Sequence, residues 1–510
     1  MNKIVLLISF FLLSLALESQ TTQDTINNPF WQAMMFDHSI NINKSKRAFD
    51  LYFSNKPKVK GTGYKQFERW YHNWKQKVNA DGSFPAPDRT NQEMKKYFRN
   101  NLTPRSATGA WTTLGPNYNA TLTYSGSFPH AGVGRVNAIA FHNTNPNIIY
   151  VGAPQGGFWY TTDKGANWTA SNDNLTLTSL GISDIAYIPG VADSVILIGT
   201  GDKNGDVSSG IGVWRSTNGG LSFINSNTGI GNKVVSRFAV NPERNSTIYA
   251  AVDDGIYVSY NKGLNWTKRA TAGTNYFKDI KYCPGDTITL YAARFGMWGP
   301  YADFYRSTDA GATWTIVTSG LNAVNKNRIE IAVTEANPNI VYIVASRSGT
   351  HVLEAFYKSS NKGASFTQRI NGTAFNILGG DIGGGDTRGQ GWYDLSIIGS
   401  PTDSNFVLVG GINIFKTANG GTSWTPSASW RSEGGTDYVH ADIHYFGRNA
   451  INNEIWVGSD GGVDFTTNNG TTYTSRNNGL SIGQIYNLGV SQRSKTRFIS
   501  GFQDDGTKVG

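Results

Sequence analysis

The chain has 510 residues, of which 59 are glycine and 13% are aromatic, a composition typical of a turn-dense β protein. The formal charge of +9 is concentrated in residues 21–110, which hold 15 Lys and Arg against 7 Asp and Glu, whereas residues 111–510 hold 29 against 28. The near-neutral larger part argues against nucleic-acid binding. The single cysteine, Cys283, excludes an internal disulfide framework and a zinc–thiolate cluster.

The chain begins with Lys3 followed by the apolar run Ile4–Leu17, which predicts a secretory signal peptide over 1–19 with cleavage near Ser19. No later stretch approaches the roughly 20 apolar residues of a transmembrane helix. We therefore expect a secreted or outer-surface protein with no transmembrane segment. Export without paired cysteines favours a bacterial envelope.

Residues 20–110 are predicted to form a basic, helical N-terminal region. An amphipathic stripe at three- and four-residue steps predicts a helix through Tyr64, Phe67, Trp70, Tyr71, Trp74 and Val78. Further helices are expected around 48–53 and over 91–99. Two interpretations remain open: a cap packed on the rest of the protein, or a basic docking surface for acidic polysaccharide or an anionic envelope.

Residues 111–510 repeat one eight-residue box: Ser/Thr, any residue, Asp/Asn, any residue, Gly, two residues, then an aromatic. The box occurs seven times, 43 to 58 residues apart, which indicates a repeat architecture. A short Asp or Asn side chain closes such a turn by accepting backbone amides, and the glycine supplies positive φ. The third position is expected to be structural in every copy: Asp163, Asn218, Asn261, Asp309, Asn361, Asn419 and Asn468.

Three short β-type stretches precede each box and a fourth follows it. The predicted fold is all-β: a seven- or eight-bladed β-propeller of four-stranded blades over 111–510. Residues 485–510 resemble three strands of an eighth unit without its box. Either Trp111–Leu114 supplies the missing strand and closes an eight-bladed ring, or the chain is a fragment of a longer protein.

The box resembles the Asp-box (BNR) repeat of sialidases, sortilin-type receptors and two-propeller xyloglucan-cleaving glycosidases. The resemblance covers roughly 111–510 and implies a propeller with each box between the third and fourth strands. The chain lacks the Arg-Ile-Pro of sialidases, and one cysteine excludes the disulfide-rich modules of sortilin-type receptors. The stretch Gly63–Trp70, followed by Phe84–Pro87, resembles the leader region of large Bacteroidetes proteins exported by type IX secretion.

Function is expected on the face that carries the second-to-third-strand turns and the connections between blades, because the long loops gather there. Aromatic rings and carboxylates alternate in these loops and predict a glycan- or protein-binding surface. Its expected ligand-binding residues are Trp298, Tyr301, Asp303, Trp392, Tyr393, Trp430, Tyr438, His440, Asp442 and His444. The alternative for Trp392 and Tyr393 is that they begin a strand and pack between blades.

Two clusters of polar residues have side chains of the kinds that bind metal ions. His440, Asp442 and His444 alternate along one strand, which suits a hydrogen-bond network in the central channel or a metal site. Asp202, Asn204 and Asp206 place oxygen ligands at alternate positions, as at the start of a calcium loop, but without its closing Glu. No cofactor other than calcium is predicted.

The alternative function is a glycoside hydrolase acting on a plant or microbial β-glucan such as xyloglucan. Two carboxylates must then flank the scissile bond, and the candidates are Asp381, Asp386, Asp460 and Asp504. The resemblance to the xyloglucan-cleaving family places one catalytic Asp in the turn Ala153–Gly157, which has no carboxylate here. Gly380–Gly384 echoes the stretch around the family's second Asp. We expect a binding protein for polysaccharide or a cell-surface protein, with hydrolysis as the alternative.

Overall fold

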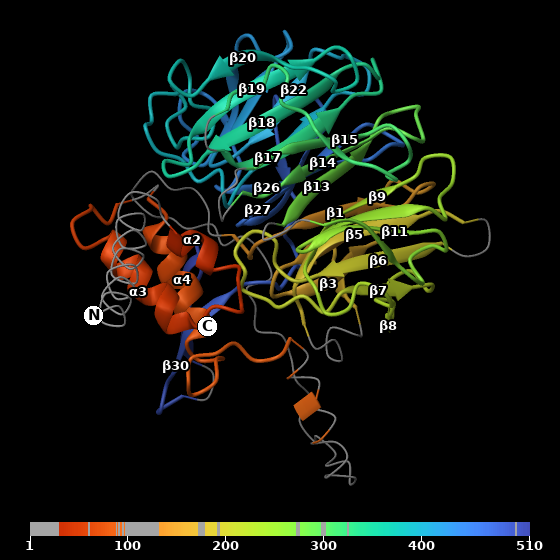
Figure 1. Cartoon of the computed structure of the whole chain (residues 1–510). Helices are drawn as coiled ribbons and strands as arrows, with labels where there is room; N and C mark the ends of the chain where they lie inside the picture. The colour runs from red at the N-terminus through yellow and green to blue at the C-terminus, as the bar shows by residue number, and fades with distance from the viewer. Residues whose placement is uncertain are drawn as a thin grey trace, which may run out of the picture. The chain divides into compact units, whose positions relative to one another are not determined.

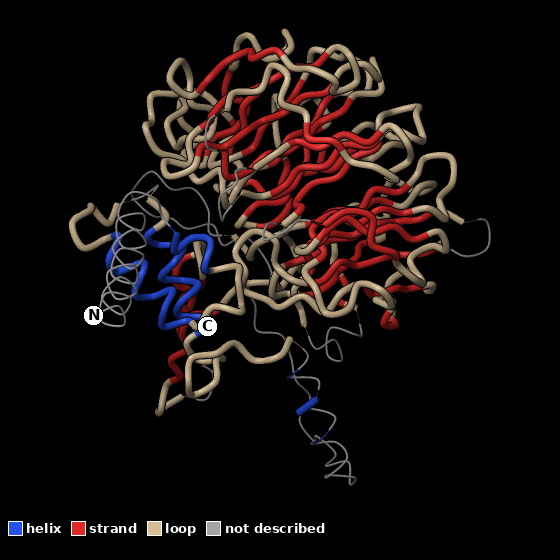
Figure 2. The backbone as a smooth tube through the Cα atoms, viewed as in Figure 1, coloured by secondary structure: helices blue, strands red, loops and turns tan. Residues whose placement is uncertain are grey.

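The computed structural model describes residues 30–509, apart from 60–61, 88, 90–91, 94–95, 97–131, 172–178, 191–193, 272–275, 297–301, 324–325 and 495–496. The chain divides into two units, residues 1–86 with 297–300, and residues 87–296 with 301–510. The named helices belong to the first unit and the strands to the second (Figures 1 and 2). None of the described helices has both the length and the apolar character needed to span a bilayer.

The first unit is a small helical core of aromatic rings. Its helices are α2 (Phe30–Met34), α3 (Ile42–Tyr52) and α4 (Tyr64–Trp74). Phe49 stacks on Phe67 with ring centroids 3.9 Å apart, and both meet the edge or face of buried Trp31. The predicted stripe is thus helical as far as Trp74. Val78 follows the helix, and only scattered residues of 91–99 are described.

The second unit contains seven antiparallel meanders and one shorter sheet. The first strands of the seven meanders are β1 (Ala138–Phe141), β5 (Ile182–Ile188), β9 (Val235–Val240), β13 (Phe277–Tyr282), β17 (Lys326–Val333), β21 (Ser396–Gly399) and β26 (Ile443–Arg448). The second strands are β2 (Ile149–Ala153), β6 (Val195–Thr200), β10 (Ile248–Val252), β14 (Leu290–Arg294), β18 (Val341–Arg347), β22 (Val407–Gly410) and β27 (Ile455–Ser459). The third strands are β3 (Gly157–Thr161), β7 (Val213–Ser216), β11 (Gly255–Ser259), β15 (Phe304–Ser307), β19 (Leu353–Ser359), β23 (Ile414–Thr417) and β28 (Gly462–Thr466).

The fourth strands are short and more exposed, as expected at the outer edge of a blade. They are β4 (Thr169–Ala170), β8 (Ile224–Asn225), β12 (Thr267–Thr271), β16 (Thr315–Ile316), β20 (Thr367–Asn371), β24 (Thr425–Ser429) and β29 (Thr474–Ser475). The sixth meander gains a parallel fifth strand, β25 (Asp437–Tyr438). The described strands therefore confirm the predicted all-β propeller of four-stranded blades.

The ring closes after seven blades. Each first strand contacts the first strand of the next blade, and β26 of the seventh blade contacts β1 of the first. Backbone bonds reinforce this junction, because Val133 and Val136 donate to the carbonyls of Gly461 and Ser459 at 3.1 and 3.0 Å. Of the two predicted blade counts, the contacts support seven.

The eighth sheet stands outside that ring. It comprises β30 (Ile485–Val490), β31 (Phe498–Phe502) and β32 (Gly506–Val509). It contacts the segment that precedes β1, because Lys508 Nζ donates to the carbonyl of Gly132 at 2.6 Å. Since β26 and β1 already meet, the eight-bladed closure is not formed; Trp111–Leu114, predicted to complete it, lies outside the described residues.

The Asp-boxes form the turns between third and fourth strands. In all seven, the Ser or Thr hydroxyl accepts the glycine amide, at 2.9 Å for Ser307 and Gly311. The Asp or Asn Oδ1 accepts the amide four residues later, at 2.9 Å for Asp309 and Thr313. Gly311 has φ 71°, which explains why glycine is required there.

We expect Asp309→Ala to lower the free energy of unfolding by about 1 kcal/mol, because the carboxylate loses the bonds that it accepts from the Thr313 amide and from the hydroxyls of Ser307 and Thr313. Asp309→Asn should be close to neutral, since five of the seven boxes carry Asn. Urea denaturation of the two variants beside the parent chain tests this. Glycan binding should be unchanged in both variants, and a binding loss in Asp309→Ala alone would contradict the structural role.

Candidate functional site

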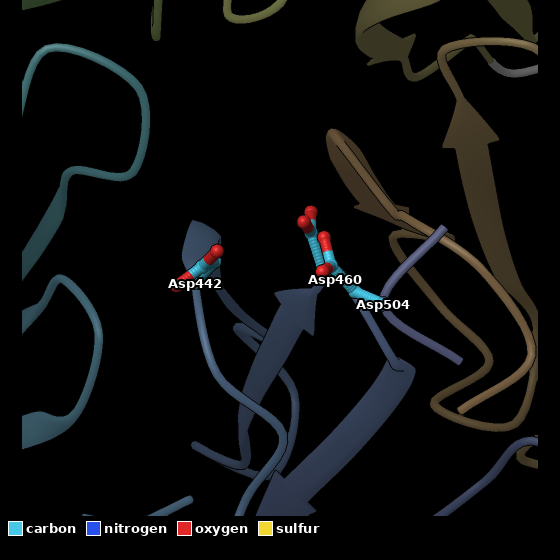
Figure 3. A group of neighbouring side chains, drawn as sticks. All are labelled: Asp442, Asp460 and Asp504. Atoms are coloured by element: carbon cyan, nitrogen blue, oxygen red, sulfur yellow. The ribbon is translucent and has the colours of Figure 1, made fainter. Parts of the chain in front are cut away.

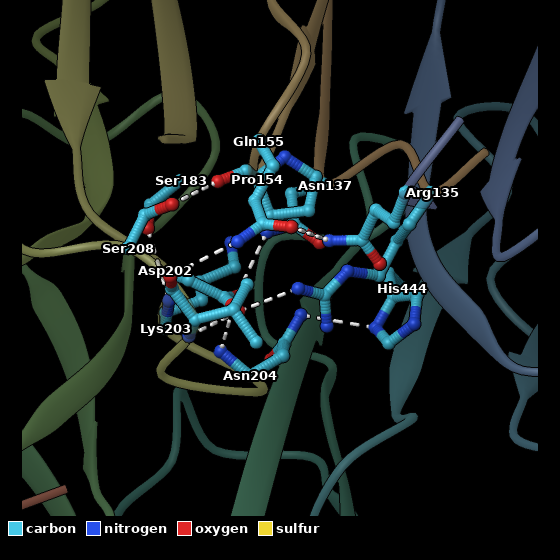
Figure 4. Close-up of polar contacts among 12 residues, drawn as sticks. Arg135, Asn137, Pro154, Gln155, Ser183, Asp202, Lys203, Asn204, Ser208 and His444 are labelled. Atoms are coloured by element: carbon cyan, nitrogen blue, oxygen red, sulfur yellow. Dashed lines mark hydrogen bonds and ion pairs between the residues drawn. The ribbon is translucent and has the colours of Figure 1, made fainter. Parts of the chain in front are cut away.

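The turns between second and third strands and the connections between blades share one face, here called the loop face. Its centre is filled by the turn after β6. Asp202 Oδ2 accepts from Arg135, and Asp202 Oδ1 accepts the Asn137 side-chain amide at 3.1 Å (Figure 4). Both residues lie just before β1, so the β6–β7 turn of the second blade is held against the start of the first blade.

Asp202, the first of the predicted calcium ligands, is instead engaged in the hydrogen bonds that hold this turn in place. Asp202 also accepts the amides of Asn204 and Val207 at 3.1 and 3.2 Å. Asp206 is buried with φ 52°, in a tight part of the turn. Calcium at 202–206 stays a prediction, and these contacts do not favour it.

A buried hydrogen-bond chain crosses from this turn to the seventh blade. Asn204 Nδ2 donates to His444 Nδ1 at 3.0 Å, and His444 Nε2 then donates to Asp460 Oδ1 at 2.8 Å. Burial and the nearby Arg135 lower the pKa of His444 well below its usual value, which keeps the ring neutral. Tyr393 completes the chain, because its hydroxyl donates to Asp460 Oδ2 at 3.0 Å and accepts from Arg135 at 3.0 Å.

Three carboxylates converge beside this chain. Asp442 immediately precedes β26, Asp460 lies in the β27–β28 turn and Asp504 in the β31–β32 turn. One oxygen from each lies within 4.8 Å of the others (Figure 3). Asp442 and Asp460 are 7% and 2% exposed, whereas Asp504 is exposed. We call these three residues the acid cluster.

Two further buried acids border the acid cluster. Burial and Asp442 raise the pKa of Asp394 well above its usual value, and neither oxygen of its fully buried carboxyl has a hydrogen-bond donor. Burial also raises the pKa of Asp505 to about 7, with His440 Nε2 3.9 Å away. Glycine is required at position 461 for His440 to take this position, because a β-carbon at Gly461 would lie 2.3 Å from His440 Cγ.

The predicted aromatic binding residues are placed unevenly. Trp298 and Tyr301 lie outside the described residues, and Asp303 pairs with Arg294. Trp392 and Tyr393 are 1% and 3% exposed, so neither ring offers a face to a sugar. The alternative expected both to begin a strand, but they lie in the turn before β21, where the Trp392 ring lies near His351 and the Tyr393 ring meets that of His444.

Trp430 lies in a contiguous wall formed by two long connections, 371–391 and 429–438. Asn413 in the β22–β23 turn joins them: its Nδ2 donates to the carbonyl of Gly380 at 3.1 Å, and its Oδ1 accepts the amide of Trp430 at 3.2 Å. Ile382 lies directly against Gly434. Trp430 is partly exposed, with the Arg431 guanidinium 4.5 Å from its ring centroid. Tyr438, also partly exposed, ends the second connection.

Asp381 and Asp386, proposed as catalytic, stand exposed on this wall but serve its turns. Asp386 Oδ2 accepts the amides of Gly380 and Asp381 at 2.7 and 2.9 Å. Asp381 accepts those of Gly383 and Gly385 at 2.8 and 3.0 Å. The other two candidates, Asp460 and Asp504, belong to the acid cluster. The structure therefore separates the four into two pairs.

Three residues of the site were not singled out from the sequence, Arg135, Gln390 and Asp505, and Asp394 was noted only as a carboxylate beside Trp392 and Tyr393. Gln390 Nε2 donates to Asp442 Oδ1 at 3.0 Å. Asp394 follows Trp392-Tyr393 and Asp505 follows Asp504, so both were adjacent to predicted residues. The sequence signal that could have indicated these acids was the number of Asp residues in the turns and connections of the loop face.

No family model matches the chain. Among curated proteins it is similar to a xyloglucanase from Hypocrea jecorina, with 25% identity over 299 residues, 48% of this chain and 33% of that protein. A xyloglucanase from Acetivibrio thermocellus is 27% identical over 221 residues, 36% of this chain and 26% of that protein. The chain thus spans a third or less of these relatives.

Solved structures agree on the fold. The GH74 xyloglucanase from Xanthomonas campestris matches with a TM-score of 0.54 and 16% identity, over 74% of this chain and 59% of that one. An ancestral GH74 enzyme matches with a TM-score of 0.56 and 16% identity, over 79% and 54%. At these identities the likeness establishes the propeller fold alone.

Proposed function

We propose that this is an exported protein that binds a neutral polysaccharide, such as a β-glucan, along the wall of the loop face. The observation that carries the proposal is Trp430, a partly exposed ring beside the exposed carboxylates and amides of two interlocked connections. A flat ring can stack on a sugar face while neighbouring polar groups bond its hydroxyls. The similarity to xyloglucanases supports a glycan ligand.

The charge of the wall and its surroundings narrows the ligand class. The two connections of the wall carry four carboxylates against the two guanidinium groups of Arg388 and Arg431, and the acid cluster adds further carboxylates; the four are Asp381, Asp386, Glu433 and Asp437. An anionic polysaccharide would be repelled by them, whereas a neutral glucan offers hydroxyl donors that carboxylates accept. We therefore favour a neutral chain over the acidic polysaccharides considered for the N-terminal region.

We expect Trp430→Ala to weaken binding of xyloglucan or a related neutral glucan about tenfold, which is ~1.4 kcal/mol. Affinity electrophoresis followed by calorimetry on the full chain measures this loss. Tyr260→Ala is the matched control, because Tyr260 is an exposed ring beside an arginine, Arg269, on the Asp-box face. Equal effects of the two substitutions would reject the wall as the binding surface.

Hydrolysis is the second candidate, and the closeness of Asp460 and Asp504 favours it. One oxygen of each lies within 4.8 Å of the other, a separation closer to the roughly 5 Å of a retaining pair than to the wider spacing of an inverting pair. Asp460 is only 2% exposed, however, which restricts access to a sugar ring. Release of reducing ends from a polysaccharide panel, lost in Asp504→Asn, would establish an enzyme; retention on the gel without release would favour binding.

A further inference from the structure

The acid cluster combines contributions from two separate sheets. Asp442 and Asp460 come from the seventh blade, whereas Asp504 comes from the three-stranded sheet outside the ring. Figure 3 shows the carboxyl groups of Asp460 and Asp504 together, with Asp442 facing them. A ligand held by all three would join the last sheet to the propeller.

The protein holds these side chains in place through several contacts. The Asp460 amide donates to the carbonyl of Asp442 at 3.2 Å, which fixes the β27–β28 turn against the start of β26. His444 and Tyr393 hold the Asp460 carboxylate from behind. The Asp504 turn is fixed by the Gln503 amide, which donates to the carbonyl of Gln484 at 2.9 Å. Such outer contacts orient the ligands of metal sites.

Asp394 supplies an independent reason to expect a ligand here. Its side chain is 0% exposed, the polar group that it meets is the carboxyl of Asp442, and no N–H or hydroxyl group of the described residues donates to either of its oxygens. A buried carboxyl without a donor costs free energy unless a proton or a cation satisfies it. Because Asp394 lies against Asp442, a proton or cation that satisfied it would lie at the acid cluster.

We propose that Asp442, Asp460 and Asp504 bind a hard divalent cation, with Asp394 supporting the site from the buried side. An all-oxygen set of carboxylates suits calcium, magnesium or manganese rather than zinc or copper. Calcium is the ion to test first, because its flexible shell of six to eight oxygens accommodates carboxylates from three separate segments. The site is separate from 202–206.

The first test is calorimetric titration of the full chain with calcium chloride after treatment with EDTA and desalting. We expect saturable binding that Asp504→Asn weakens by about tenfold or more, and Asp394→Asn by roughly 10–100-fold. Asp504 is exposed, so its substitution should not prevent folding. Asp309→Asn is the matched control, since it removes one carboxylate on the opposite face and should leave the affinity unchanged.

A structural readout separates this site from adventitious binding. Calcium should protect the last sheet from trypsin at Arg493 and Arg497, because the ion ties the Asp504 turn to the seventh blade. Protection should be lost in Asp504→Asn and retained in Asp309→Asn. Absence of binding at millimolar calcium, or equal affinity in the two variants, would overturn the proposal and leave a proton shared by Asp394 and Asp442 as the explanation.

Discussion

Replacing Arg237 with alanine should lower the free energy of unfolding by about 3–5 kcal/mol, the usual cost of removing one partner from a buried ion pair. Arg237 lies on β9 of the third blade and is 5% exposed. Its guanidinium lies 3.7 Å from Asp184, 3.4 Å from Asp279 and 3.5 Å from Glu330, on the second, fourth and fifth blades. The side chain also lies 4.9 Å from the ring centroid of Tyr445 on the seventh. One cation therefore links the first strands of five blades.

The remaining charges decide how large this loss is. Asp279 keeps Lys281 at 3.3 Å, and Glu330 keeps Arg328 at 2.9 Å, so the cost falls mainly on Asp184 and on the vacated volume. Asp184 cannot simply turn away, because its Oδ2 accepts the Phe238 amide at 2.7 Å. A neutral partner should restore part of the loss, so Arg237→Ala with Asp184→Asn should be more stable than Arg237→Ala alone.

Urea denaturation of the full chain measures both variants. Arg448→Ala is the control, because Arg448 pairs at 2.7 Å with Glu335, whose side chain is 60% exposed, and such surface pairs contribute less than about 1 kcal/mol. A loss in Arg237→Ala no larger than in Arg448→Ala would show that the charges around Arg237 are solvated rather than buried. Arg237→Lys should fall between the parent and the alanine variant.

The propeller could be predicted from the sequence because its signal is local. Each Asp-box is a turn whose hydrogen bonds join residues four apart, such as Ser307 with Gly311, and these bonds depend on side chains within a single short segment. Seven copies at blade spacing then indicate the ring. The blade number could not be settled this way, since it depends on whether β26 meets β1, a contact between residues about 300 apart in sequence.

The site was predicted residue by residue but not as an arrangement. Asp442, Asp460 and Asp504 were each named, the first for glycan or metal binding and the others for hydrolysis, and only the fold brings the three together. Asp394 illustrates the limit, because nothing in Trp392–Asp394 shows that its carboxyl points into the protein against Asp442. The same segment misleads about Trp392, because the exposed part of the connection ends at residue 388 and residues 389–397 are buried.

The pH dependence of stability should have a large contribution from His351. This residue lies in the turn between β18 and β19, fully buried, and its backbone carbonyl accepts the Gly391 amide of the wall at 3.1 Å. Burial, with a smaller effect of Arg388, lowers the pKa of His351 to about 3. The unfolded chain binds a proton at this residue below about pH 6.5, whereas the folded chain does not. Stability from His351 is therefore complete above pH 6.5 and is lost as the pH falls towards 3.

We expect this single residue to reduce the free energy of unfolding by roughly 1.4 kcal/mol per pH unit below 6.5, or about 2.7 kcal/mol by pH 4.5. His351→Asn removes the titrating ring and is matched to the site, because His351 has φ 59° and asparagine tolerates that conformation. Urea denaturation of parent and variant at intervals from pH 7.5 to 4.5 gives the difference, in which the other titrating groups cancel. A constant difference across that range would mean that His351 binds a proton as readily in the folded chain as in the unfolded chain. A difference that narrows with falling pH would instead show that the His351 ring stays neutral in the folded chain, where its Nδ1 lies 2.8 Å from Asn327 Nδ2.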